Sequence, residues 1–284
     1  KKMAFAAFMM STASTGGTFL SYGMSALISL IGDFKITFLL TALLLFIAAS
    51  FWFIYNQFFI EKIVVNVEQS GQVQEAEVKK DERTQRDVPE KFLLFIGLFA
   101  LFVIVAYAIA GGLKSWMPSI LKETFNLGDS ISIFLSVFLP FCSIFNATIS
   151  TLFYKKNKNI TLICMIFFVA SCVLLVPLLL FLRVNWLLTL ILIIMLCMTM
   201  GVITNLLTVQ APLFLQNKKY NSGFLAGLLN GAAYLGNAIS TYVLGIIADN
   251  SEWKSIFLLF MVLLGGCVLL SVFGSIMQKK IKNV

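Results

Sequence analysis

Three hydrogen-bonding side chains recur at helical spacing inside an apolar stretch, NSGFLAGLLNGAAYLGNA at 221–238. Asn230, Tyr234 and Asn237 lie four and three residues apart, which places them on one side of a helix. Amide and phenol groups on one helix face can bind the hydroxyl or carboxylate groups of a small solute. They could equally form hydrogen bonds to a neighbouring helix, and the sequence leaves both interpretations open.

Small residues share this side of the predicted helix. The glycines at four-residue spacing, for which we predict close helix packing, are Gly223, Gly227 and Gly231. The leucines on the opposite side, where we expect lipid, are Leu225, Leu228, Leu229 and Leu235.

One-sided stripes of polar and small residues occur in four other apolar segments as well. The predicted solute-binding residues are Tyr22, Tyr107, Lys114, Asn146, Asn205, Asn230, Tyr234 and Asn237. Lys114 would supply a positive charge for an anion. Its position near a predicted helix end also suits a lysine that extends to the membrane surface.

The apolar segments themselves are long enough to cross a membrane. The 284 residues are 60% hydrophobic and 12% charged, with a mean hydropathy of +0.95. A membrane helix needs about 20 apolar residues. The sequence predicts an all-α polytopic membrane protein with eight spans, at about 4–31, 34–56, 92–113, 130–153, 160–181, 185–210, 221–247 and 254–277.

The distribution of positive charge predicts the orientation of these spans. If both ends of the chain are cytoplasmic, most of the 21 lysines and arginines lie on the cytoplasmic side. The charged segment 57–91 then forms a cytoplasmic linker. This asymmetry explains the net charge of +8 without a nucleic-acid partner. We expect a multi-pass protein of the plasma membrane, a lipid bilayer around it, and a monomer.

The sequence lacks the residue patterns of several common enzyme mechanisms. The sequence has no histidine. Its five cysteines all fall inside predicted spans, where we interpret them as small apolar packing residues. This excludes Ser/His/Asp catalysis and histidine-metal sites from this sequence. We therefore expect no catalytic residues, no metal and no cofactor, and a protein that is not an enzyme.

An internal repeat indicates how the spans are organised. An offset of 219 residues aligns Gly17 with Gly236 and Ser21 with Ser240, and places Lys35 on Lys254. Spans one and two then correspond to spans seven and eight, so the repeating unit has six helices. The predicted domains are 1–56, the last two helices of an N-terminal half; 57–91, the linker; and 92–284, a C-terminal six-helix half.

Two stretches, GGLKSWMPSILKETFNL at 111–127 and SGFLAGLLNGAAYLGNAISTYVLGIIADNSEWKSIF at 222–257, resemble the major facilitator superfamily. The resemblance covers essentially the whole chain and implies eight of twelve helices in two six-helix halves. The second stretch is most similar to the organophosphate and sugar-phosphate antiporter branch. That branch carries an arginine six residues before a Trp-x-Pro motif, and Ala110 occupies this position here.

The resemblance implies a secondary active transporter that works by alternating access, as an antiporter or a symporter. We expect its solute to be small and polar, an organic anion or a compound like a sugar phosphate. Two alternatives stay open. The first is an exporter of amphipathic compounds, with which the content of 28 phenylalanines is consistent. The second is a transporter-like sensor that binds solute and signals through the 57–91 segment.

Overall fold

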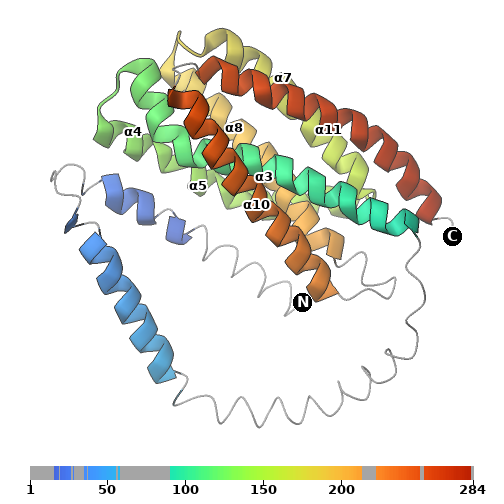
Figure 1. The fold of residues 1–284 in the computed structure, drawn as a ribbon, viewed down its shortest axis with the longest axis horizontal. Coiled ribbons are helices and arrows are strands. Elements are labelled where there is room, and N and C mark those ends of the chain that lie inside the picture. Colours follow the sequence, from blue (N-terminus) through green and yellow to red (C-terminus); the bar gives the residue numbers. More distant parts are fainter. Residues whose placement is uncertain are drawn as a thin grey trace. The chain divides into compact units, whose positions relative to one another are not determined.

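The computed structural model describes residues 16–18, 20–26, 28, 35–36, 38–55, 57, 90–212, 222–249 and 253–282 (Figure 1). Most of these residues are helical, and none of them belongs to a strand. From residue 90 on, the helices are α3 (Glu90–Phe125), α4 (Asp129–Ser136), α5 (Phe138–Ser143), α6 (Phe145–Lys156), α7 (Ile160–Phe181), α8 (Trp186–Asn205), α10 (Ser222–Asp249) and α11 (Trp253–Lys282), and the π-helix η2 (Leu206–Gln210) continues α8.

Seven helical segments of the described residues are long and apolar enough to cross a membrane. They are Phe38–Tyr55, Leu93–Phe125, Asp129–Lys156, Ile160–Phe181, Trp186–Gln210, Ser222–Ala248 and Trp253–Ile276. The all-α polytopic membrane fold is therefore confirmed. The first predicted span, 4–31, lies mostly outside the described residues, as does the predicted linker 57–91.

The chain forms two compact units. One consists of Ile28–Leu93 and contains the helix Phe38–Tyr55; the other combines Lys1–Leu27 with Leu94–Val284. The predicted division into a 1–56 domain, a linker and a 92–284 domain stays a prediction. Every candidate site residue belongs to the larger unit.

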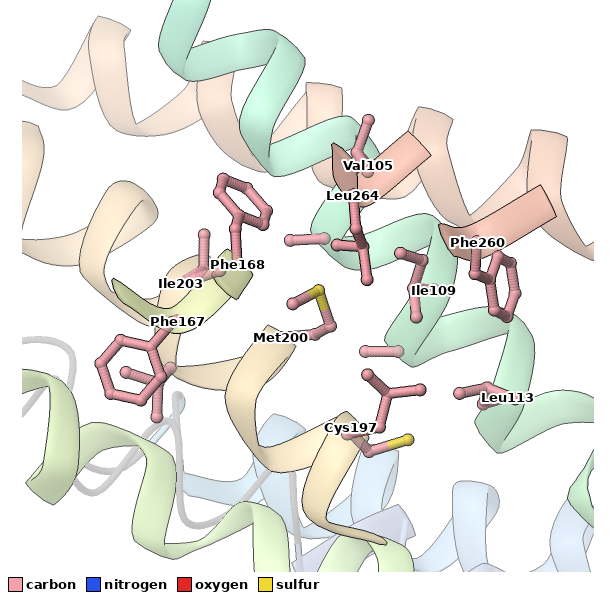
Figure 2. Packing of buried hydrophobic residues seen from close by; sticks show 14 of the residues in the cluster. Val105, Ile109, Leu113, Phe167, Phe168, Cys197, Met200, Ile203, Phe260 and Leu264 are labelled. Carbon is pink, nitrogen blue, oxygen red and sulfur yellow. The ribbon is translucent and has the colours of Figure 1, made fainter. Parts of the chain in front are cut away.

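The core of the larger unit is built around α3. Phe95, Phe99 and Phe102 recur at helical spacing and are almost fully buried. The Phe102 ring meets Phe168 of α7 edge to face, with centroids 5.2 Å apart. Figure 1 shows α7 beside α11, and Figure 2 shows side chains of α3, α7, α8 and α11 packed together. These four helices form the apolar core, and the candidate site residues lie on them and on the helices packed against them.

Helix α3 is longer than the sequence predicts. The expected span ended at 113, but the helix continues to Phe125. Met117, Ile120 and Leu121 extend its buried face and are at most 1% exposed. The predicted end was wrong because the polar residues after 113 resemble a helix terminus while the core stripe continues past them.

The sequence predicts one continuous helix for the span Asp129–Lys156. The structure instead has three segments there: α4, α5 and α6. Pro140 has no N–H group and therefore cannot donate to the carbonyl four residues earlier. The Ser136 and Ser143 hydroxyls donate to carbonyls one turn back in their own segments, at 2.8 and 2.9 Å, which favours bending. These interruptions set the direction of α6, which carries Asn146.

Candidate functional site

A polar seam joins α6 to α8. The Ser150 hydroxyl donates to Asn205 Oδ1 over 2.7 Å. One turn earlier, the Asn146 amide lies over Gly201, where an added Cβ would overlap it. Both contacts advance by four residues on each helix, so α6 and α8 run in the same direction. The structure thus brings together two predicted site residues, Asn146 and Asn205.

Asn146 is the less satisfied of the two. Its side chain belongs to a residue only 7% exposed, and its Oδ1 has no hydrogen-bond partner among the described residues. A buried acceptor left without a donor costs about 1–3 kcal/mol. In the same seam, the neighbouring Asn205 Oδ1 accepts a hydrogen bond from Ser150, whereas Asn146 Oδ1 accepts none from a described residue.

The seam ends at the π-helix η2. Gln210 Nε2 donates to the Thr151 hydroxyl over 3.3 Å, which links η2 to α6. The sequence predicts that Gln210 caps free backbone groups ahead of Pro212; the observed side-chain bond corrects this. A π-helical turn inside an α-helical span often marks a functional region.

A second seam joins α3 to α10. Gly236 lies against the Ile104 main chain, because a Cβ at 236 would overlap the Ile104 carbonyl. Further along, the Asn237 amide lies over Gly111, and Asn237 Oδ1 is buried without a partner among the described residues. The Ser240 hydroxyl likewise lies over Gly112 and lacks a partner there.

Sequence reasoning missed most of these packing glycines. Those with a side chain or main chain directly over them are Gly111, Gly112, Gly201 and Gly236. A Cβ at Gly227 or Gly231 would meet no atom within 4 Å in the described structure, so the packing role assigned to the Gly223 repeat stays a prediction. The Gly111–Gly112 pair was the available signal, since adjacent glycines inside a span are costly unless something approaches closely.

The faces of α10 differ from the prediction. Leu225 and Leu229 are 2% and 1% exposed and pack inside the protein, so the expectation that lipid covers them is wrong. Tyr234 is 67% exposed, and its ring meets Tyr107 of α3 with centroids 5.8 Å apart. Asn230 is exposed and donates back to Ala226 O of its own helix over 2.9 Å. Of the polar face predicted to line a pathway, Asn230 and Tyr234 are therefore uncovered within this unit, next to exposed apolar residues such as Leu228 and Leu235, whereas Asn237 packs against α3.

Lys114 lies well inside α3, half-buried. Its carbonyl accepts a 2.6 Å hydrogen bond from the Tyr22 hydroxyl. Its ammonium lies in electrostatic range of the Cys197 thiol on α8 but has no hydrogen bond or ion pair with any described residue. Because α3 continues to Phe125, Lys114 lies eleven residues before the end of the helix.

Two tryptophans, also missed, fasten α3 to the far end of α10 and to the start of α11. Trp116 Nε1 donates to Thr241 O over 3.3 Å, and Trp253 Nε1 donates to the Glu123 carboxylate over 2.9 Å. The two indoles lie 6.2 Å apart, centroid to centroid. Both stand in the stretches that resemble a transporter family, which was the one signal that could have singled them out.

The structure thus contains two glycine-lined polar seams, a lysine, Lys114, whose ammonium pairs with no described residue, and seven described segments long and apolar enough to cross a membrane. A search of curated proteins gave no match. The profile of the Major Facilitator Superfamily matches residues 1–218, which is most of the chain. The chain belongs to the Major Facilitator Superfamily of membrane transporters.

Proposed function

We propose that this transporter moves a small organic anion by alternating access, and that Lys114 attracts the anionic group. The supporting observation is the ammonium of Lys114, half-buried inside a membrane helix without a carboxylate partner among the described residues. A lysine inside a membrane helix costs up to roughly 2.5–3.5 kcal/mol on insertion scales, the value at the helix centre. An anionic solute would offset this cost while bound.

Carboxylates and phosphate monoesters are the two anion classes that suit this site. A lysine binds either as a point charge. The sugar-phosphate branch that the chain resembles uses an arginine where this chain has Ala110, which is 4% exposed. If phosphate esters are carried, Lys114, one turn further along α3, takes over that charge.

The uncovered polar face of α10 supports the pathway. Asn230, Tyr234 and Tyr107 lie on or beside it, and none of the described helices covers Tyr234. We propose that this face borders the route of the solute, with cytoplasmic chain ends and a plasma-membrane location as the charge distribution predicts.

Uptake into proteoliposomes tests the proposal. Radiolabelled carboxylates and phosphate monoesters are first screened for uptake by the wild-type protein, and the best substrate is then measured with Lys114→Gln, Lys114→Arg and Lys122→Gln. Lys122 is a matched control, because it lies on α3 but is exposed and paired with Asp129 at 2.7 Å. We expect at least tenfold slower uptake by Lys114→Gln, partial retention by Lys114→Arg and normal uptake by Lys122→Gln. Normal uptake by Lys114→Gln would exclude the assigned role.

A further inference from the structure

The two seams share an unusual contact: an asparagine amide lies over a glycine of the neighbouring helix. Asn146 of α6 lies over Gly201 of α8, and Asn237 of α10 lies over Gly111 of α3. In both contacts Oδ1 is buried and has no donor among the described residues. The two contacts differ in the atom that faces the glycine: Nδ2 of Asn146 points at Gly201, whereas Oδ1 of Asn237 points at Gly111.

Both contacts lie close to where α3 and α8 meet. Figure 2 shows Ile109 and Leu113 of α3 in the same cluster as Met200 and Cys197 of α8. Gly111 lies between the two α3 residues in sequence, and Gly201 follows Met200 directly. Successive spans reverse direction, so α3 and α8 are antiparallel and their two glycines lie at about the same depth.

Lys114 lies at the same meeting point. It is one helical turn beyond Gly111, and its ammonium is in electrostatic range of Cys197, which is one turn before Gly201. One turn of four residues spans about 6 Å along a helix. A solute held by Lys114 thus has an unsatisfied acceptor, Asn146 Oδ1, about one turn away along α8.

We propose that Asn146 and Asn237 form a paired acceptor site for the hydrogen-bond donors of the transported anion, which makes hydroxylated or aminated organic anions the preferred substrates. This inference rests on the proposed anion transport. The oxygen of an asparagine amide only accepts, and no described residue donates to Oδ1 of Asn146 or of Asn237 in the state shown. An apolar side chain of the same size would suit a permanently dry seam better.

A local movement of α6 away from α8, or of α10 away from α3, would part each seam and expose its amide to the solute. Asn146 is nine-tenths buried here, so the state shown is the one in which the acceptor is withheld from solute. The glycines opposite leave room for the end of each amide to approach the neighbouring helix in that state. Because glycine has no side chain, the two helices can close over the asparagine without a clash. When they separate, the amide oxygen can accept a hydrogen bond from a donor group of the bound solute.

Matched pairs of anions test the inference on the purified protein. The probes are 4-hydroxybutyrate against butyrate, and 4-hydroxybutyl phosphate against butyl phosphate, since a four-carbon chain spans about 5 Å. Dissociation constants are obtained from the rise in unfolding temperature with ligand concentration. The variants are Asn146→Leu, Asn237→Leu and Lys114→Gln, with Thr148→Leu as a control at an exposed position of α6.

We expect the wild-type protein and Thr148→Leu to bind the hydroxylated member on the order of tenfold more tightly, as one hydrogen bond permits. Asn146→Leu and Asn237→Leu should bind both members equally, and Lys114→Gln should lose both. Asn146→Ser gives the same comparison should the leucine variant not fold. Equal binding of both members by the wild type, or an unchanged preference in the asparagine variants, would overturn the paired acceptor while anion binding stands. If no anion shifts the unfolding temperature of the wild type, the anion proposal fails and this inference fails with it.

Discussion

Gly236 lies so close to the main chain of Ile104 that a Cβ at position 236 would overlap the Ile104 carbonyl oxygen. This contact sets the separation of α3 and α10. A backbone atom cannot rotate away as a side chain can, so the close approach depends on the absence of a side chain at this position.

Gly236→Ala should therefore destabilise the protein by roughly 1–3 kcal/mol, the usual cost of forcing extra volume into a packed contact. Gly231→Ala is the matched control on the same helix, since a Cβ there meets nothing within 4 Å. It should be neutral or slightly stabilising, because alanine favours helix over glycine by about 1 kcal/mol. Thermal unfolding of both purified variants measures the difference. Equal unfolding temperatures would show that α3 and α10 are not packed through Gly236.

The Ser150–Asn205 hydrogen bond should couple α6 to α8 measurably. Ser150→Ala leaves Asn205 Oδ1 without its 2.7 Å donor, and we expect a loss of about 1 kcal/mol in the free energy of unfolding. A double-mutant cycle with Asn205→Leu isolates the pair. Denaturation in mixed detergent–SDS micelles gives the four free energies, and the coupling should fall between roughly 0.5 and 2 kcal/mol. Strictly additive effects would mean that the two side chains do not interact.

The hydrogen bond from Trp253 to Glu123, which links α11 to α3, should contribute more to the free energy of unfolding than the nearby Lys122–Asp129 salt bridge does. Trp253 is buried, and its indole donates to the Glu123 carboxylate over 2.9 Å. Trp253→Phe should cost about 1–2 kcal/mol, because a hydrogen bond to a charged group is lost together with some packing. Lys122→Gln breaks an ion pair whose side chains are 57% and 65% exposed, and it should cost less than about 1 kcal/mol. Unfolding temperatures in the reverse order would contradict this ranking.

The sequence predicts the existence of the spans well and the directions of their faces poorly. Hydropathy separates membrane helices from loops, which is why the segments from 92 to 277 all reappear as helices. It cannot tell lipid from protein, because both are apolar, and so Leu225 and Leu229 were placed on the wrong side. The end of α3 was misplaced for a related reason: the polar residues after 113 resemble a helix end, but the core stripe continues to Phe125.

The candidate site was only partly predictable. Spacing alone selects Asn146, Asn205, Asn230, Tyr234 and Asn237, but it cannot show that two of these amides lie over glycines of other helices. Such contacts join residues distant in sequence, and no local pattern encodes them.

A thiol placed at position 234 should report whether the uncovered face of α10 borders an aqueous pathway. Tyr234→Cys replaces a side chain that is 67% exposed, whereas Leu225→Cys replaces one that is 2% exposed on the same helix. The native thiols Cys164, Cys197 and Cys267 are buried and should stay unmodified, whereas the partly buried Cys142 and Cys172 are first replaced by alanine. In intact proteoliposomes a membrane-impermeant thiol reagent should label Tyr234→Cys, and a transported anion should change the rate, because it shifts the population between inward-open and outward-open states. Leu225→Cys should be inert in both conditions. Since lipid does not carry a charged reagent to a thiol, labelling at 234 requires water at that face. An inert Tyr234→Cys, with and without anion, would mean that lipid or protein covers it and that the pathway lies elsewhere.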